Sequence, residues 1–511
     1  MRIRLSLAIV ALLLTGWSAT AVIPPATSAQ KVAEQVCADP PLASSAVGVF
    51  AMRMDGDTVA SVNPRVKLVP ASNMKLLTTG MALRELGADF RFETKIAYSG
   101  AVKDSVLVGD LYIVGGGDPT TGANVPCAEQ LTSLFSQWLK IVRAAGIKSV
   151  RGRIVADARY FDLTTPEGLG WTYDDLGTNY GAGPTGLNFF ENAQNFLIVP
   201  GASVGDAPGI TPRYPQMPWM TFVNHARTSS ARSANTVYYI NTHLSPVGEF
   251  GGNFPIDRKG YTFEGSNRFG AYTLAWYFLD YLKGKNFSVG GGCADIDALG
   301  RLRLSAGEIV PPDAEAAVPQ ESLVVIGSTY SHSLASIAAE TNFESDNFFA
   351  ETLLKTVSRH RGRGGDYDSA VAAAADVLAD MGLNVAYGCR IFDGSGLSRK
   401  NYVSPSFFVS FLRAMASSDV RDAYLRSLPQ PGGRGTLEYK FPKAPASLRS
   451  RIRMKSGSMN GVLCYSGYIL SSDGDPSHDI AFSILTNNVT ASTWVTAPQV
   501  DKIIEALAAE N

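Results

Sequence analysis

The stretch Pro70-Ala-Ser-Asn-Met-Lys-Leu-Leu-Thr-Thr-Gly-Met-Ala-Leu83 indicates a buried helix around which the rest of the chain is arranged. Pro70 cannot continue a preceding helix, and Ser72 is a residue type that favours a helix N-terminus. The apolar residues that follow leave no clean polar face, as expected for a helix at the centre of a domain. Because Ser72 and Lys75 are three residues apart, both should lie on one face of that helix.

Lys75 is a candidate base for Ser72. A serine hydroxyl with its ordinary pKa is a poor nucleophile and needs an adjacent base. A lysine ammonium cannot accept a proton, but burial lowers the pKa of lysine and favours the neutral amine. The Ser-x-x-Lys pattern is short and recurs at Ser28 and Lys31. The assignment therefore depends on other motifs in the chain.

Length and composition limit the classes of protein to consider. A chain of 511 residues is too long for one compact core, so two or three domains are expected. The content of 45% hydrophobic and 18% charged residues is that of a folded globular protein. The formal net charge of −1 offers no basic excess for a nucleic acid partner.

The first 29 residues have the features of a secretory signal peptide. Arg2 and Arg4 precede an apolar core at residues 5–14, and small-residue cleavage sites follow at Ala19-Thr-Ala21 and Thr27-Ser-Ala29. An N-terminal anchor is the alternative, but the core is too short to span a bilayer. We therefore expect an exported protein, periplasmic or cell-wall associated, with no transmembrane segment after cleavage.

The five cysteines are dispersed and form no C-x-x-C pair, which argues against a zinc site. In an exported chain two pairs could oxidise, and the odd number leaves at least one thiol unpaired. The cysteines are Cys37, Cys127, Cys293, Cys389 and Cys464.

The order of predicted elements indicates a domain that is split by an insertion. Residues 30–92 give a short helix, two strands around a turn, and the Ser72 helix. Residues 321–511 give further helices, three strands and a final helix. Residues 93–320 differ from both: they contain many short runs in which apolar and polar residues alternate, which is typical of strands, and few predicted helices. The sequence therefore predicts an α/β domain, an antiparallel sheet flanked by helices, interrupted by mostly β inserted domains, two in number.

Two later motifs accompany Ser72 and Lys75. Ser345-Asp346-Asn347 opens a predicted helix between aromatic residues, although Ser and Asp are also ordinary helix-capping residues. Lys455-Ser456-Gly457 extends a predicted strand and is the only Lys-[Ser/Thr]-Gly in the chain. The small Gly457 would let a substrate backbone lie along the strand edge, and Ser458 could offer its N–H to an oxyanion. The alternative is an exposed lysine before a turn.

The three motifs in this order mark penicillin-binding proteins and class A β-lactamases, which have Thr in the third motif. Ser72 and Ser345 are 273 residues apart, too far for a class A β-lactamase. The chain resembles the class C low-molecular-mass penicillin-binding proteins, the DacB-like D-alanyl-D-alanine carboxypeptidase/endopeptidase family, which carry large domains inserted between these motifs. Four further stretches of this chain are similar to sequence landmarks of that family: Gly109-Asp-Leu-Tyr-Ile-Val-Gly-Gly-Gly-Asp-Pro119, Asp393-Gly-Ser-Gly-Leu-Ser-Arg399, Leu428-Pro-Gln-Pro-Gly-Gly-Arg-Gly-Thr-Leu437 and Ser466-Gly-Tyr468.

The resemblance implies a β-lactamase/transpeptidase-like fold and a serine peptidase mechanism. Ser72 would attack the penultimate D-Ala carbonyl and form an acyl-enzyme, with Lys75 as the base. Ser345, helped by the charge of Lys455, would pass a proton to the leaving amine, and Asn347 would hold the substrate amide. No metal or organic cofactor is implied.

The resemblance also implies how the substrate end is held. Lys455 and Ser456 would attract the terminal carboxylate, and the N–H groups of Ser72 and Ser458 would form the oxyanion hole. Ser456 departs from the family's usual Thr but keeps the hydroxyl. The expected partners are peptidoglycan peptides that end in D-Ala-D-Ala or are cross-linked, together with β-lactam inhibitors, which should acylate Ser72.

A side-chain pocket is expected from Trp171-Thr-Tyr-Asp-Asp-Leu-Gly-Thr-Asn-Tyr180. On the residues alone this is a loop with ordinary surface aromatics. The resemblance implies that Trp171, Tyr180 and Met459 pack the stem of a meso-diaminopimelate-type side chain. Asp174 would pair with its ammonium, and Asp175 is the alternative because the spacing is approximate.

Two other functions would fit parts of this sequence. A β-lactamase would need a dedicated acid for fast deacylation, such as the Glu of class A enzymes, and no convincing equivalent is found. A non-catalytic cell-wall binding protein would be expected to have lost Ser72, Lys75 or Lys455, and all three are present. The balance between carboxypeptidase and endopeptidase action stays open.

Overall fold

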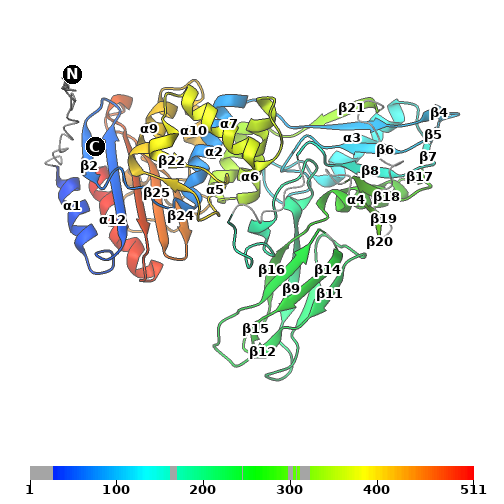
Figure 1. The fold of residues 1–511 in the computed structure, drawn as a ribbon, viewed down its shortest axis with the longest axis horizontal. Coiled ribbons are helices and arrows are strands. Elements are labelled where there is room, and N and C mark those ends of the chain that lie inside the picture. The colour runs from blue at the N-terminus through cyan, green and yellow to red at the C-terminus, as the bar shows by residue number, and fades with distance from the viewer. Residues whose placement is uncertain (1–26, 162–169, 244, 297–302, 306–307, 311–322) are drawn as a thin grey trace, which may run out of the picture.

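The computed structural model describes residues 27–161, 170–243, 245–296, 303–305, 308–310 and 323–511. A body built on a five-stranded sheet lies at the left of Figure 1, and the region inserted into the chain extends to the right with a lobe below. We call these the sheet domain and the inserted region. The expected signal peptide lies outside the described residues except for its last three.

The sheet domain is built on an antiparallel sheet with the strand order β2-β1-β26-β25-β24. Its strands are β1 (Ala46–Arg53), β2 (Thr58–Val62), β24 (Ile452–Met459), β25 (Val462–Ile469) and β26 (Ile480–Asn487). Strands β25 and β26 are buried along their whole length, because helices cover both faces of the sheet. The predicted antiparallel sheet flanked by helices is confirmed.

Helices α1 and α12 pack on one face of this sheet, with α11 beside them, and the remaining helices lie on the opposite face (Figure 1). They are α1 (Ser28–Ala38), α2 (Met74–Leu86), α5 (Leu334–Phe343), α6 (Asn347–His360), α7 (Tyr367–Asp380), α8 (Val385–Gly388), α9 (Pro405–Ala416), α10 (Arg421–Ser427), α11 (Ala446–Arg449) and α12 (Thr493–Ala509). A short ladder of β22 (Cys389–Arg390) and β23 (Tyr402–Val403) joins them.

Helix α2 is the buried central helix that the sequence predicts. Every residue from Met74 to Leu83 is buried. Ser72 does not begin this helix; it lies in a 3-10 turn, Ala71–Asn73, that precedes it. Ala71 adopts φ 46°, a left-handed conformation that costs energy for a residue with a Cβ. The helix ends at Gly87, whose φ of 83° suits glycine.

The first part of the inserted region is a mixed sheet with the order β20-β19-β18-β8-β6-β3-β21. Helices α3 (Leu131–Ala144) and α4 (Gly270–Gly284) pack against it, so this part is α/β rather than mostly β. Its strands are β3 (Glu93–Tyr98), β6 (Leu111–Val114), β8 (Ile154–Asp157), β18 (Cys293–Ile296), β19 (Arg303–Ser305), β20 (Glu308–Val310) and β21 (Val324–Tyr330).

Strand β21 corrects the expected end of the insertion. The sequence placed the return to the sheet domain at residue 321, but β21 pairs with β3 from Val324 to Tyr330. These two strands are the outgoing and incoming connections of the inserted region. The boundary therefore lies after Tyr330, because an apolar strand gives no local sign of which sheet it joins.

The lobe below in Figure 1 is a small β unit with an aromatic core formed by Phe196, Tyr239, Phe250 and Phe263. Its strands are β9 (Ala193–Val199), β10 (Gly209–Pro212), β11 (Thr221–Asn224), β12 (Arg227–Ser229), β13 (Tyr238–Thr242), β14 (Ser245–Gly251), β15 (Asn253–Pro255) and β16 (Tyr261–Ser266). A separate small sheet contains β4 (Ala101–Lys103), β5 (Val106–Val108), β7 (Ser149–Val150) and β17 (Ser288–Val289).

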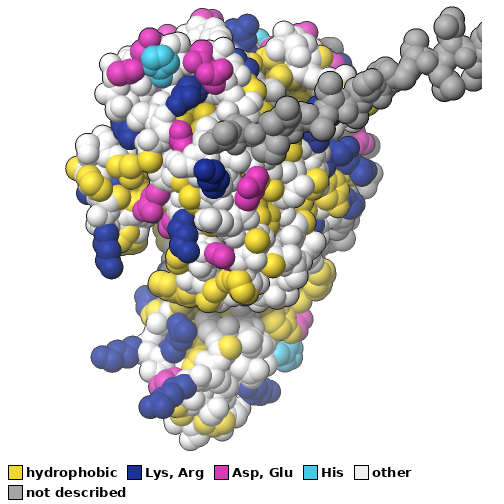
Figure 2. All heavy atoms as spheres, turned by 90° about the vertical axis from the view of Figure 1, so that its left-hand side faces the viewer, with side chains coloured by type: hydrophobic (Ala, Val, Ile, Leu, Met, Phe, Trp, Pro, Cys, Tyr) yellow, Lys and Arg dark blue, Asp and Glu magenta, His cyan; other side chains and the backbone are white. Residues whose placement is uncertain are grey.

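Figure 2 looks onto the end of the molecule that carries α1 and α12, where basic and acidic side chains are interspersed. Within the described residues, no helix combines the length and apolarity that a membrane crossing requires. All five cysteines are free thiols, so neither of the two disulfides that the sequence allowed is formed.

Candidate active site

The fold brings the three sequence motifs together. Ser72 and Lys75 come from the turn before α2 and its first turn, Ser345 and Asn347 from the start of α6, and Lys455 from β24. The Lys75 Nζ donates to Ser72 Oγ at 3.1 Å and to Asn347 Oδ1 at 2.6 Å. The Lys455 Nζ donates to Ser345 Oγ at 3.0 Å. Two lysine–hydroxyl pairs thus lie in one site.

Lys75 is fully buried, with 0% of its surface exposed. Its third partner is the carbonyl of Ser395, at 2.8 Å from Nζ. Burial lowers the pKa of Lys75 to about 8, although the charges of Asp346, Glu351 and Asp393 act to raise it. About a tenth of Lys75 is therefore the neutral amine at pH 7 and about half at pH 8, and this neutral form is what a base for Ser72 requires.

The second motif is held in a strained conformation. Ser345 has φ 59°, which is uncommon for a residue with a side chain. Asp346 caps α6 by accepting a hydrogen bond from the Phe349 N–H at 2.7 Å. Ser345 and Asn347, which flank Asp346, then face the site. Backbone strain of this kind is concentrated where geometry is set for function.

Lys455 is also fully buried, and it donates to the carbonyl of Ser456 at 2.7 Å. Burial, and to a lesser degree the charge of Lys75, lowers the pKa of Lys455 well below its ordinary value. The Ser456 hydroxyl donates to Thr436 Oγ1 at 3.2 Å. Thr436 was not singled out from the sequence, although it belongs to a quoted family landmark.

Gly457 is required for a reason other than the one expected from the sequence. A Cβ at this position would lie 2.8 Å from the Pro70 carbonyl oxygen and 2.9 Å from the Asn73 N–H nitrogen. The missing side chain therefore lets β24 pass against the turn that carries Ser72. β24 is the last strand of its sheet, so no described strand pairs with its other edge. The Met454 N–H on that edge donates to the Pro429 carbonyl at 3.0 Å, which leaves the part of the edge beyond Met454 for an extended peptide.

The residues of the expected side-chain pocket are brought near the site. The Asn347 side chain donates to the Tyr180 carbonyl at 3.1 Å, and 44% of the Tyr180 surface is exposed. Trp171 is buried, and its indole N–H donates to Asp393 at 2.8 Å. Met459 is half-buried.

The structure distinguishes the two acidic candidates in this loop. The Asp175 carboxylate accepts from the N–H of Thr172 at 3.1 Å and from its hydroxyl at 2.6 Å. Asp175 is therefore engaged in closing its own turn. Asp174 is exposed, and within the described part of the chain its side chain makes no hydrogen bond or ion pair.

An acidic contact also links the inserted region to the second motif. The half-buried Glu191 lies close enough to Asp346 for each carboxyl to affect the pKa of the other. Burial and the charge of Asp346 raise the pKa of Glu191 well above its ordinary value, and burial raises the pKa of Asp346. The neutral form of Glu191 is therefore favoured beside Asp346. Glu191 carried no sequence signal, because its partner is far away in the chain.

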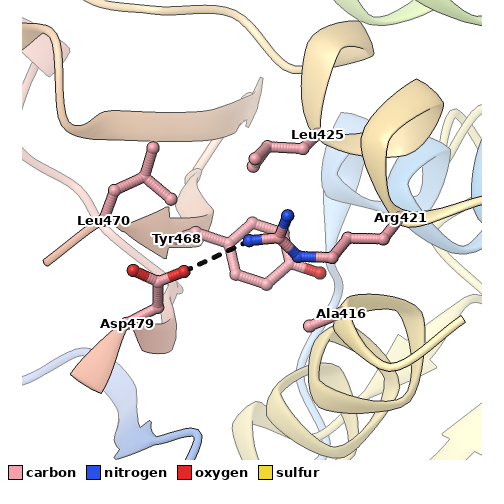
Figure 3. Close-up of a pocket in the computed structure, with 6 residues that line it drawn as sticks. All are labelled: Ala416, Arg421, Leu425, Tyr468, Leu470 and Asp479. Carbon is pink, nitrogen blue, oxygen red and sulfur yellow. Dashed lines mark ion pairs between the residues drawn. The ribbon is translucent and has the colours of Figure 1, made fainter. Parts of the chain in front are cut away.

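A small cavity lies elsewhere in the sheet domain, between α9, α10 and the ends of β25 and β26 (Figure 3). Arg421 reaches across it to Asp479 at 3.6 Å, with Tyr468 behind (Figure 3). Its volume of about 10 Å³ has room for roughly one water molecule. It cannot hold a peptide, so it is part of the packing rather than a binding site.

Known proteins match this chain in both the sheet domain and the inserted region. The model of the D-Ala-D-Ala carboxypeptidase 3 (S13) family matches residues 29–280 and 304–509. A D-alanyl-D-alanine carboxypeptidase of Actinomadura sp. (strain R39) is 29% identical over 472 residues, covering 89% of this chain and 80% of the relative. The D-alanyl-D-alanine carboxypeptidase DacB of Haemophilus influenzae is 22% identical over 437 residues, covering 84% of each.

The crystal structure of penicillin binding protein 4 (dacB) from Haemophilus influenzae has a TM-score of 0.75 to this chain at 21% identity. The match covers 94% of this chain and 98% of that one. A structure of the same protein complexed with a novel β-lactam has a TM-score of 0.71. The fold is therefore shared along nearly the whole chain, insertion included.

Proposed function

The chain is a peptidase that belongs to the D-Ala-D-Ala carboxypeptidase 3 (S13) family, and from this premise we propose that it cleaves peptidoglycan stem peptides through an acyl-enzyme on Ser72. The observation that carries the proposal is the position of Lys75. Its buried Nζ lies 3.1 Å from the Ser72 hydroxyl, and burial lowers its pKa to about 8. A nucleophile and its base are thus in hydrogen-bond contact.

The acylation step follows from this geometry. The neutral Lys75 amine takes the hydroxyl proton while Ser72 Oγ attacks the carbonyl carbon of the penultimate D-Ala. The peptide C–N bond breaks, and the terminal D-Ala leaves as an amine that receives its proton through Ser345. Lys455 supports this transfer, because its Nζ lies 3.0 Å from the Ser345 hydroxyl. Water then hydrolyses the ester and restores Ser72.

The outer edge of β24 beyond Met454, with which no described strand pairs, supports the proposed substrate orientation. An extended peptide would add to this edge as a further strand, with its terminal carboxylate near Lys455 and the Ser456 hydroxyl. The N–H groups of Ser72 and Ser458 are the proposed oxyanion hole. Either a free D-Ala or a D-Ala bound into a cross-link can serve as the leaving group, which gives carboxypeptidase or endopeptidase action.

Benzylpenicillin tests this proposal. Its strained amide should acylate Ser72, and the opened ring keeps the leaving nitrogen attached, so the whole mass of the drug adds to the protein. Mass spectrometry should find one adduct on wild type and none on Ser72→Ala with an unchanged circular dichroism spectrum. Labelling that persists in Ser72→Ala would refute the nucleophile. An adduct that lasts only seconds would favour a β-lactamase instead.

We also propose that the loop containing Trp171 and Tyr180 selects the peptide side chain. Met459 is the last residue of β24, the strand that carries Lys455. Asp174 is exposed and directly precedes Asp175 in the sequence. A side chain with an apolar stem and an amino acid end, of the meso-diaminopimelate type, would match this set. Its ammonium would pair with Asp174, since Asp175 is already bound to Thr172.

The test of the pocket is Asp174→Asn. A charge-assisted hydrogen bond is worth about 1.5–3 kcal/mol, and exposure of Asp174 places the effect at the lower end, near a tenfold loss of kcat/KM. The loss should occur with a peptide bearing the free side-chain amine. Acylation by benzylpenicillin, which lacks this group, should stay almost unchanged. Equal losses on both substrates would show that Asp174 supports the fold only.

Export is part of the proposal, since the substrate lies outside the cytoplasm. It is supported by the signal-like sequence at residues 1–29. We accordingly place the enzyme in the periplasm or at the cell wall.

A further inference from the structure

A tight turn at residues 393–398 lies against the general base. Its Ser395 carbonyl accepts from Lys75 Nζ at 2.8 Å, and its Gly394 carbonyl accepts from the Thr78 hydroxyl at 2.6 Å. Gly396 has φ 85°, and a Cβ there would lie 1.9 Å from the Ala71 carbonyl oxygen. The turn is thus packed directly on the segment that carries Ser72 and Lys75.

Glu351 holds this turn from one side. It lies on α6, is almost fully buried, and accepts from the N–H groups of Gly394 at 2.9 Å and Ser395 at 2.8 Å. The Ser395 N–H shares its peptide group with the Gly394 carbonyl that reaches Thr78, so Glu351 fixes that group directly. It holds the Ser395 carbonyl that reaches Lys75 through the adjoining peptide group. The mechanism proposed above gives Glu351 no role, yet a buried carboxylate is costly unless its bonds are needed.

Asp393 holds the turn from the other side. Its carboxylate, fully buried, accepts from the N–H of Gly396 at 2.8 Å, the N–H of Ser398 at 2.6 Å and the side chain of Asn401 at 2.7 Å. A further donor comes from the inserted region, the indole N–H of Trp171 at 2.8 Å. This hydrogen bond connects the proposed substrate-selecting loop to the turn that holds Lys75.

We propose that Trp171, Asp393 and Glu351 are positioning residues for Lys75, acting through the turn at residues 393–398. Trp171 then has a role beyond packing a substrate side chain: its N–H makes the inserted region part of the framework of the base. The inference rests on the proposed function, because it assumes that Lys75 activates Ser72. It predicts that loss of the Trp171 hydrogen bond slows acylation by every acyl donor, including one that never enters the pocket.

The decisive variant is Trp171→Phe, assayed with benzylpenicillin. The phenyl ring keeps an aromatic face toward a substrate side chain but removes the donor to Asp393. We expect the acylation rate to fall roughly tenfold, the effect of one hydrogen bond to a charged group. Trp138→Phe is the matched control, since Trp138 is also buried in the inserted region and donates to Thr329 at 2.9 Å, but does not contact the turn.

The outcomes separate the two hypotheses. A Trp171→Phe protein that acylates slowly, beside a Trp138→Phe protein with the wild-type rate, supports the positioning role. A Trp171→Phe protein that is slow only on a peptide substrate, and normal with benzylpenicillin, assigns Trp171 to the pocket alone and overturns the inference. If wild type itself is not labelled on Ser72, the proposed function fails first, and the inference fails with it.

Glu351→Gln gives an independent readout if Trp171→Phe does not fold. The charged groups that face Lys75 are Asp346, Glu351 and Asp393 from α6 and the turn, and Lys455 from β24. The negative charge of Glu351 raises the pKa of Lys75. Because the amide has only one acceptor oxygen for the two N–H groups of the turn, the variant should acylate more slowly at the plateau. Because the charge is lost, its rate should level off at a lower pH than wild type. A wild-type rate and pH profile in Glu351→Gln would overturn the role of Glu351.

Discussion

Lys75 donates three hydrogen bonds, to Ser72, Asn347 and Ser395, and all three acceptors are uncharged. Since no carboxylate of the described residues is in direct contact with its Nζ, the cost of burying the ammonium is not offset by an ion pair. The pKa of Lys75 falls to about 8 for this reason. The neighbouring carboxylates act from a distance and keep it from falling further.

The pH dependence of acylation follows from this value. Only the neutral amine can take the Ser72 proton, so the rate should rise with pH and level off above about 8, where Lys75 is deprotonated. Stopped-flow acylation by benzylpenicillin between pH 6 and 10 measures the profile. Lys75→Arg should be nearly inactive across this range, because the guanidinium stays protonated. An active arginine variant would rule out the base role.

At this scale the sequence predicted the pairing of Ser72 with Lys75 but not its surroundings. The three-residue spacing brings the two side chains together in any helical turn. The Ser395 carbonyl is 320 residues further along the chain, so no local pattern could place it against Lys75. The role of Gly457 was likewise hidden, since its close neighbour Pro70 belongs to a different element.

The start of α6 joins the sheet domain to the inserted region. Asp346 caps the helix and also lies beside Glu191, which itself has φ 55° and a raised pKa. A neutral carboxyl can donate to its partner, but two ionised carboxylates repel each other. This contact between elements therefore depends on the protonation of one member.

Glu191→Gln should change how stability depends on pH. The pKa of Glu191 is raised in the folded chain, so its contribution is fully present below the ordinary value of 4.5 and is lost as pH rises through the raised value. The amide donates at every pH, so the variant should lose less stability than wild type on going from pH 5 to 8. Thermal unfolding monitored by circular dichroism measures the difference, expected to be about 1 kcal/mol. Parallel curves for the two proteins would contradict a raised pKa of Glu191 in the folded chain.

Most individual elements could be predicted, whereas their partners could not. The helix that Ser345-Asp346-Asn347 was expected to open is α6, Asn347–His360, because Asp346 is a good cap and aromatic residues flank it. Strand β21, which follows residue 321, joins the inserted sheet and not the sheet domain. Strand pairing is decided by contacts remote in sequence, and here it moved a domain boundary.

At the scale of the whole molecule, the split of the sheet domain followed from the separation of the first two motifs. That the insertion also contributes residues to the candidate active site could not be predicted in this way. Trp171 and Tyr180 return from the inserted region to touch Asp393 and Asn347, so the insertion helps to build the site. No spacing rule links these residues, because the connecting chain folds as a separate sheet in between.

The two ends of the described chain also meet. The Thr27 hydroxyl donates to the Val59 carbonyl at 2.6 Å and accepts from the Gln30 N–H at 3.0 Å, capping α1. The Ser28 hydroxyl and the Ala29 N–H both donate to Glu510 at the end of α12. Residues 27–29 therefore belong to the folded domain, and under the export proposed above we expect cleavage at Ala21 and not at Ala29.

A comparison of two truncated chains tests this. A protein that starts at Gln30 lacks the Thr27 cap and the bonds to Glu510, whereas one that starts at Val22 keeps them. Loss of a threonine cap costs about 0.5–2 kcal/mol, so the shorter protein should unfold at a lower urea concentration. Intact-mass analysis of the protein after export should find the N-terminus before Thr27. Equal urea midpoints, or a mature chain that begins at Gln30, would show that α1 is held by its packing on α12 and the sheet without its N-terminal cap.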